Sequence, residues 1–157
     1  MDPLRLDRDL VRQHTTEKVY PRAQAIVEDG QIVEVVRRGN RLDAVVWGSD
    51  VEPYRVRIVI EAGPLGTDRL EAVTCTCPYS FAGWCKHAAA VVLMAIDVPG
   101  EIPERAALAS RLDDLGADEL RTVLLELDEA HLHLTDEIEA RAEGRDPEPP
   151  SWADEIW

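Results

Sequence analysis

The chain has 157 residues, of which 45% are hydrophobic and 31% charged, and its formal net charge is −14. This length fits one domain, or a small domain with a helical appendix, and the composition is typical of a globular protein. Residues 1–98 carry 12 basic and 14 acidic side chains, whereas residues 99–157 carry 5 basic and 17 acidic ones. The chain as a whole therefore lacks the basic surface that binds nucleic acid non-specifically, and any such contact must use a local patch.

The cysteine count and the apolar stretches indicate the cellular compartment. Three cysteines cannot form a closed set of disulfides, so we expect reduced thiols. No apolar stretch approaches the length of a membrane span, and the first residues lack the basic and apolar regions of a signal peptide. We therefore expect a cytoplasmic protein without a membrane partner.

The first predicted elements are two short helical segments and a β-hairpin. Residues 7–13 and 16–25 are expected to be helical. The pattern then changes to that of strands, because residues 32–36 and 42–47 are rich in β-branched side chains. The Gly39-Asn40 dipeptide supplies a turn signal between them, so a tight antiparallel hairpin follows.

Two further strands are expected before the cysteine-rich segment. Residues 54–61 alternate between apolar and polar side chains, which predicts a half-buried strand. Residues 70–76 form the last predicted strand, which delivers Cys75 and Cys77. Since side chains two positions apart on a strand share a face, both thiols should point to the same side.

The rest of the chain has a helical pattern. Residues 85–97 combine strong helix formers with an apolar surface over most of the circumference, followed by a Val98-Pro99-Gly100 stop signal. We expect the sheet to cover one side of this helix and the helices after Pro103 to cover another. Leucines mark two such helices, one ending at Gly116 and the next at amphipathic spacing over residues 120–127, and a last helix over residues 135–142 follows.

Four soft metal donors lie within thirteen residues. The segment reads C-x-C-x7-C-x-H, with Cys75, Cys77, Cys85 and His87 as the donors. Thiolate and imidazole groups are the ligands of tetrahedral Zn²⁺, and four protein ligands leave no open position for catalysis. The alternatives are buried thiols beside a chance histidine, and a [2Fe–2S] centre, against which the short C-x-H spacing argues. His131 and His133 form a weaker pair, for which ordinary helix positions are the simpler interpretation.

The cysteine-rich segment resembles the SWIM zinc finger, through C-x-C-P, a short aromatic-containing loop, C-K-H and then an apolar run. Upstream, Gly39-Asn40, the run at residues 46–50 and the run at residues 53–56 are similar to bacterial SWIM-containing proteins. The resemblance covers residues 20–97. It implies a ββα unit in which the first ligand pair lies near a strand end and the second opens a helix. It also implies one structural Zn²⁺ held by Cys75, Cys77, Cys85 and His87.

The expected fold class is α+β: a small antiparallel sheet with the zinc site, followed by a helical C-terminal extension. We expect a zinc-binding domain over residues 1–98, an acidic helical extension over residues 99–145 and a flexible tail over residues 146–157. The tail contains Trp152 and Trp157, which are candidate anchors for a protein partner.

Arginines cluster on and beside the predicted strands. Together with Lys86 they are the candidate nucleic-acid-binding residues: Arg37, Arg38, Arg41, Arg55 and Arg57. The simpler interpretation is a solvated face paired with Glu34, Asp43 and Glu61. The alternative is a phosphate-binding patch, helped by stacking of Tyr79, Phe81 or Trp84 from the zinc loop.

The resemblance implies a binding function, since SWIM modules occur in transposases, signalling proteins and recombination factors and beside helicases. No Ser-His-Asp set, phosphate-binding glycine loop or paired-carboxylate motif is visible, so we expect no enzyme, no catalytic residues and no small-molecule substrate. The acidity of the chain favours a protein-interaction adaptor for a larger, DNA-processing complex, with a helicase-type ATPase as one candidate partner. Nucleic-acid binding through the arginine patch is the alternative.

Overall fold

The computed structural model describes residues 4–63, 68–79 and 81–145. The expected flexible tail, with Trp152 and Trp157, lies outside the described residues. The chain divides into two compact units, Met1–Ala107 and Leu108–Trp157. The architecture is α+β, as the sequence predicted.

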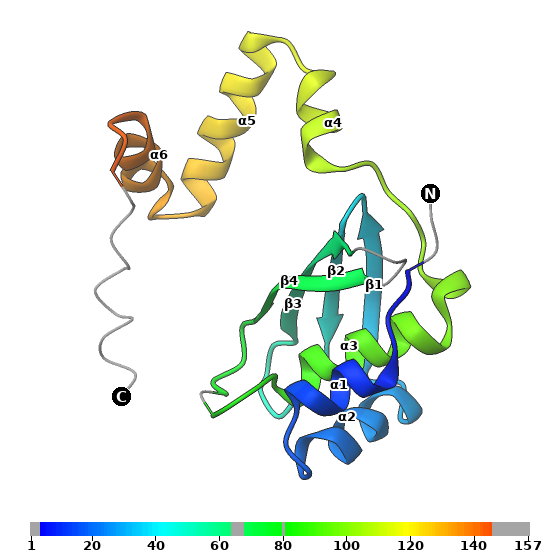
Figure 1. Ribbon diagram of the computed structural model, residues 1–157. Coiled ribbons are helices and arrows are strands. Elements are labelled where there is room, and N and C mark those ends of the chain that lie inside the picture. The colour runs from blue at the N-terminus through cyan, green and yellow to red at the C-terminus, as the bar shows by residue number, and fades with distance from the viewer. Residues whose placement is uncertain (1–3, 64–67, 80, 146–157) are drawn as a thin grey trace. The chain divides into compact units, whose positions relative to one another are not determined.

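A four-stranded antiparallel sheet in the order β1-β2-β3-β4 forms the centre of the first unit (Figure 1). Its strands are β1 (Ile32–Arg38), β2 (Arg41–Val46), β3 (Tyr54–Ala62) and β4 (Asp68–Cys75). Gly39 adopts a φ of 62° in the two-residue turn between β1 and β2, a conformation that favours glycine. The predicted hairpin is therefore present, and each strand pairs with the next one along the chain.

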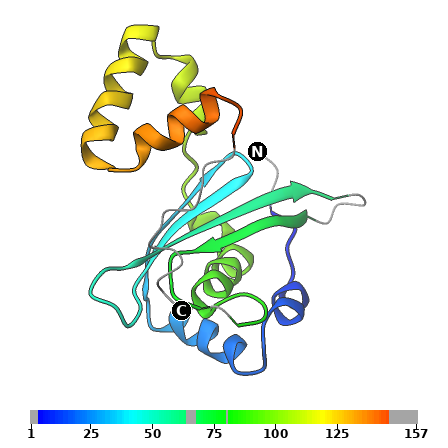
Figure 2. The ribbon, with the colours of Figure 1, turned by 90° about the vertical axis from the view of Figure 1, so that its left-hand side faces the viewer.

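One face of this sheet is buried against helices. The apolar residues of β2 and β3 alternate with polar ones, so that the buried set falls on a single face. This set consists of Leu42, Ala44, Val46, Tyr54, Val56, Ile58 and Ile60. The helices are α1 (Arg8–His14), α2 (Val19–Glu28) and α3 (Lys86–Asp97), which ends before the 3₁₀ turn η2 (Pro99–Glu101). Figures 1 and 2 show the three helices gathered on one side of the sheet.

Helix α3 lies at the centre of the core, with almost all of its residues from His87 to Ala95 buried. The sheet covers one of its sides, and α2 packs along another with a smaller contribution from α1. The sequence analysis expected this cover from the helices after Pro103. That expectation was wrong, because α2 and α1 pack there instead. An apolar sequence pattern shows that a helix must be buried, but it does not show which segment packs against it.

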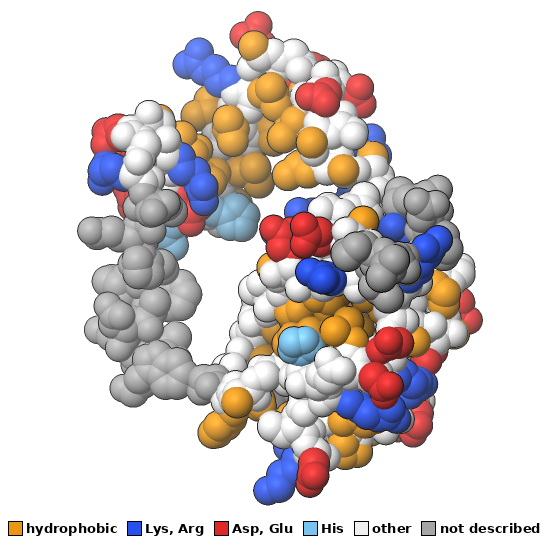
Figure 3. All heavy atoms as spheres, viewed as in Figure 1, with side chains coloured by type: hydrophobic (Ala, Val, Ile, Leu, Met, Phe, Trp, Pro, Cys, Tyr) orange, Lys and Arg blue, Asp and Glu red, His pale blue; other side chains and the backbone are white. Residues whose placement is uncertain are grey.

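The second unit contains three helices, α4 (Leu108–Asp113), α5 (Ala117–Ala130) and α6 (Leu134–Ala142). Among its described residues, Ala140 is the one buried side chain. Hydrophobic side chains gather over α4 and α5 in Figure 3. These exposed residues, here called the leucine face, are Leu108, Leu112, Val123, Leu124 and Leu127. None of the described helices is both long and apolar enough to cross a membrane.

Candidate metal centre

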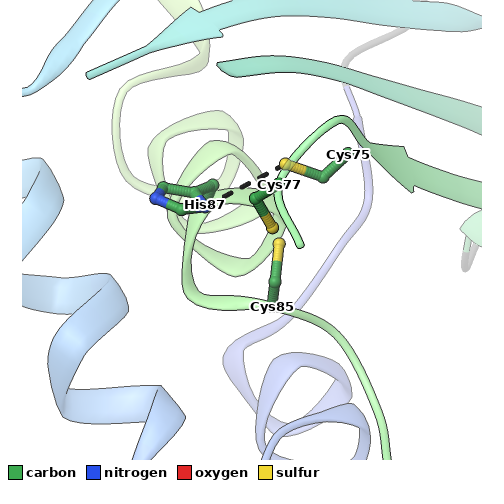
Figure 4. Close-up of side chains that lie close together, drawn as sticks. All are labelled: Cys75, Cys77, Cys85 and His87. Atoms are coloured by element: carbon green, nitrogen blue, oxygen red, sulfur yellow. Dashed lines mark hydrogen bonds between the residues drawn. The ribbon is translucent and has the colours of Figure 1, made fainter. Parts of the chain in front are cut away.

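The four predicted donors converge where β4 gives way to α3 (Figure 4). Cys75 is the last residue of β4, and Cys77 lies in the bend that follows it. Cys85 is the N-cap of α3, and His87 occupies its first turn. The sequence analysis ended this strand at residue 76 and relied on strand alternation to align Cys75 and Cys77, but β4 ends at Cys75. The bend, rather than strand alternation alone, brings the second thiol to the cluster.

The donor atoms are close enough to share one ion. One ligand atom from each residue, namely the three Sγ atoms and a ring nitrogen of His87, lies within 4.8 Å of all the others. The Cys75 Sγ atom is 4.0 Å from His87 Nδ1. A tetrahedral zinc site with Zn–S and Zn–N distances of about 2.3 and 2.0–2.1 Å places its donors roughly 3.8 Å apart. Small side-chain rotations would therefore close the four donors on Zn²⁺, and the residues present fit the ion.

The loop between the two donor pairs is tied to the end of α1. The Trp84 amide donates a hydrogen bond to the His14 carbonyl at 2.7 Å, and the two rings stack with centroids 4.6 Å apart. Gly83 has a φ of 82°, and a Cβ there would meet the His14 carbonyl oxygen at 2.4 Å. The sequence analysis did not single out His14. The structure shows that this residue supports the metal-binding loop, which no local motif could reveal.

The three thiols are not equivalent in the metal-free site. A hydrogen bond from the Cys75 thiol lowers the pKa of Cys85 to about 4, although burial opposes this shift. The Ala88 amide, at the N-terminal end of α3, also donates to the Cys85 sulfur at 3.4 Å. The same pairing with Cys85 raises the pKa of Cys75, and burial raises that of Cys77. Before metal binds, Cys85 is therefore the thiolate of the cluster, and it lies at a helix N-terminus, where negative charge is favoured.

A hollow of about 230 Å³ lies beside the cluster. Cys77, Cys85 and His87 contribute to its lining, together with two cations, Arg22 from α2 and Lys86 from α3. Three thiolates and a neutral imidazole around Zn²⁺ leave a charge near −1, which these cations can offset. Lys86, which the sequence analysis grouped with the candidate arginines, lines this hollow beside the metal ligands.

Four of the five candidate arginines share the open face of the sheet. Arg38, Arg41, Arg55 and Arg57 belong to this face, as the strand register shows. Arg37 pairs with the fully buried Leu42 across β1 and β2, so it belongs to the other face. The simpler interpretation holds for three of the four, because the Asp43 carboxylate forms ion pairs with Arg38, Arg41 and Arg57. Glu61 forms no ion pair among the described residues.

The open face also contains a cation that the sequence did not single out. The segment after η2 runs along the edge of β1, where the Arg37 amide donates to Pro103 and the Arg105 amide donates to Arg37. Arg105 thereby joins a hollow of about 530 Å³ on the sheet face, where it pairs with Glu34 at 2.9 Å. The charged residues lining this hollow are Glu34, Arg38, Asp43, Arg55, Arg57 and Arg105.

The remaining candidates do not form a second site in the described residues. The cluster of Cys75, Cys77, Cys85 and His87 is the one group of three or more metal-ligating side chains there, so His131 and His133 join no such group. Of the zinc-loop aromatics, Trp84 stacks on His14, Tyr79 packs edge-on against Phe81, and Phe81 is 76% exposed.

Three thiols and one imidazole at a strand-to-helix joint define the class of Cys₃His zinc fingers. The model of the SWIM zinc finger family matches residues 54–96, a range that holds β3, β4, α3 and all four donors. This part of the chain is similar to the SWIM zinc finger. No curated protein and no solved structure matches the chain.

Proposed function

We propose that this protein is a non-enzymatic adaptor, in which one structural Zn²⁺ holds the first unit together and the leucine face of the second unit binds a protein partner. The observation that carries the proposal is the exposure of that face. Leu124 and Leu127 are 46% and 42% exposed, although their spacing on α5 is that of a buried helix surface, and Leu108 of α4 is 56% exposed. Large exposed apolar patches with polar surroundings are typical of protein-binding sites.

The donor set supports a structural role for the ion. Cys75, Cys77, Cys85 and His87 would fill all four positions of a tetrahedral Zn²⁺, so no position remains for a substrate or a reactive water. The donors come from the end of β4, the following bend and the start of α3. An ion held there fixes the angle between the sheet and the central helix of the core.

The charge around the leucine face indicates what kind of partner fits. Residues 108–145 carry four arginines and eleven acidic side chains. Charge complementarity favours a partner with an apolar ridge bordered by lysines and arginines. Since SWIM modules also occur beside helicases, a helicase-type ATPase of a DNA-processing complex is one candidate partner.

The test is purification of the tagged protein from its own cells, with and without nuclease, followed by identification of what stays bound. The variant Leu124→Gln/Leu127→Gln should lose the bound protein, because it removes apolar surface without changing the charge. The matched control Val33→Gln/Val51→Gln alters two exposed apolar residues of the first unit and should retain it. The proposed role of the leucine face would be contradicted if the leucine variant kept every bound protein. It would also be contradicted if the leucine variant and the valine control lost the same protein.

Nucleic-acid binding by the sheet is the second candidate, and the hollow on the open face favours it. Four arginines and two acidic residues line this hollow, and the side chain of Arg55 forms no ion pair among the described residues. If this face binds phosphates, Arg55→Glu/Arg57→Glu should abolish a binding that falls steeply as salt rises. The control Arg12→Glu/Arg121→Glu makes the same charge change on α1 and α5 and should bind more strongly than the sheet variant.

A further inference from the structure

We propose that Gly48 positions the metal ligand His87, by providing room for a tyrosine ring that holds the imidazole in place. Gly48 follows β2, far from the cysteine-rich segment, and lies outside the range that matches the zinc finger family. It is not among the glycines of positive φ, so its backbone conformation is open to any residue. The reason for a glycine here is space.

The space at Gly48 is filled by two side chains. A Cβ at this position would lie 2.2 Å from Cε2 and 2.6 Å from Cδ2 of Tyr54, and 3.0 Å from Nε2 of His87. Tyr54, the first residue of β3, is 8% exposed, and its ring centroid lies 4.7 Å from that of His87. The Gly48 backbone, the tyrosine ring and the imidazole therefore pack together without room for one more methyl group.

This packing replaces an interaction that metal-binding histidines usually have. A ligating histidine almost always donates its second ring N–H to a carboxylate, carbonyl or water, and that hydrogen bond fixes the ring orientation. With Nδ1 directed at Cys75, the free ring nitrogen of His87 is Nε2, which Figure 4 shows pointing away from the cysteines. It is buried and has no hydrogen-bond partner among the described residues. The imidazole is oriented by contact with Tyr54 and Gly48 instead.

The consequence for the metal site is steric. His87 is 4% exposed, so its ring cannot rotate away from an intruding methyl group without moving its neighbours. Zinc sites require ligand distances within about 0.2 Å of their normal values. A shift of the ring caused by a Cβ on residue 48 would therefore weaken the bond from Nδ1 to the ion, although Gly48 donates nothing to it.

The experiment compares the zinc affinity and the Co²⁺ spectrum of full-length variants. Gly48→Ala should weaken zinc binding in a chelator competition by about 10- to 100-fold, the range for residues that orient metal ligands. It should also change the visible absorption of the Co²⁺-substituted protein, which reports ligand geometry. The control is Gly100→Ala, because a Cβ there meets nothing within 4 Å and the backbone is not at positive φ. A Gly48→Ala protein with the affinity and spectrum of the Gly100→Ala protein would overturn the proposal.

A second variant tests the same contact by removing the obstacle. Tyr54→Leu removes the ring that holds the imidazole, so it should weaken zinc binding by itself. In that background the smaller side chain makes room for the added methyl group, so adding Gly48→Ala should cost at least tenfold less affinity than it costs the unaltered protein. An equal cost in both backgrounds would show that Gly48 does not act through the tyrosine, and the proposal would fail.

Discussion

The two compact units of the chain differ in how they use their leucines. In the first unit Leu42 and Leu93 are 0% and 1% exposed, enclosed between the sheet and the helices. In the second unit Leu124 and Leu125 are 46% and 58% exposed on α5, an amphipathic helix without a buried residue. The first unit buries its apolar residues in its own core and has the four metal donors at its strand-to-helix joint. The second leaves part of its apolar surface exposed, and this is the surface that we propose binds a partner.

The largest expected difference between the units is their response to metal removal. Chelation of zinc, or Cys77→Ser, should expose residues 70–97 to hydrogen exchange, because the binding energy of a structural zinc, on the order of 10 kcal/mol or more, is linked to folding. Exchange in α5 should change little. His131→Ala, which removes a histidine outside the cluster, is the control. Unchanged protection of residues 70–97 after metal loss would show that the ion is not structural.

Truncation of one leucine in each unit compares a buried with an exposed leucine side chain directly. Leu42→Ala should lower the free energy of unfolding by about 2–5 kcal/mol, the range for removing a buried leucine side chain. Leu124→Ala should change it by roughly 0.5 kcal/mol, as for most surface positions. Urea denaturation followed by circular dichroism measures both. Equal losses would mean that Leu124 is packed in solution and that the leucine face is not free.

Local spacing predicted those features of the fold that depend on neighbours in the sequence. The alternation in residues 54–61 predicted β3 and its buried face, and the Gly39-Asn40 dipeptide predicted the hairpin. The C-x-C and C-x-H pairs predicted the donors because each pair needs only one bend or one helix start to bring its members together. The family resemblance agreed with this reading.

Contacts between distant segments could not be predicted in this way. Arg105 reaches the open sheet face because the chain after η2 pairs with the edge of β1, and no pattern near Arg105 encodes that path. His14 stacks on Trp84 and Gly48 lies against His87, and in both pairs the partner is far away in the sequence. An isolated glycine or histidine gives no local signal for such packing.

The differences among the thiols predict how many protons zinc displaces from the first unit. At pH 8 the Cys85 thiol, with its lowered pKa, is already deprotonated, whereas the raised pKa values of Cys75 and Cys77 keep these two protonated. Zinc binding should then release about two protons, and the apparent binding free energy should gain about 2.7 kcal/mol per pH unit.

Calorimetry in buffers of different ionisation enthalpy counts these protons. Cys85→Ser should weaken binding, because it removes one of the four ligands. Release of three protons by the unaltered protein would show that Cys85 is protonated before the metal arrives, against the effect of its neighbours.

The smallest expected effect concerns the contact that joins α1 to the zinc loop. The rings of His14 and Trp84 are nearly parallel, with 11° between their planes, and stacked aromatic pairs contribute about 0.5–1.5 kcal/mol beyond their buried area. His14→Ala should therefore lower the free energy of unfolding of the zinc-bound protein by about that amount. His14→Phe, which keeps a flat ring, should retain most of it, and His131→Ala should have no comparable effect. The hydrogen bond from the Trp84 amide to the backbone carbonyl of residue 14 persists in every variant, so the comparison isolates the stack. A loss in His14→Phe as large as in His14→Ala would show that the imidazole contributes through something other than its flat surface.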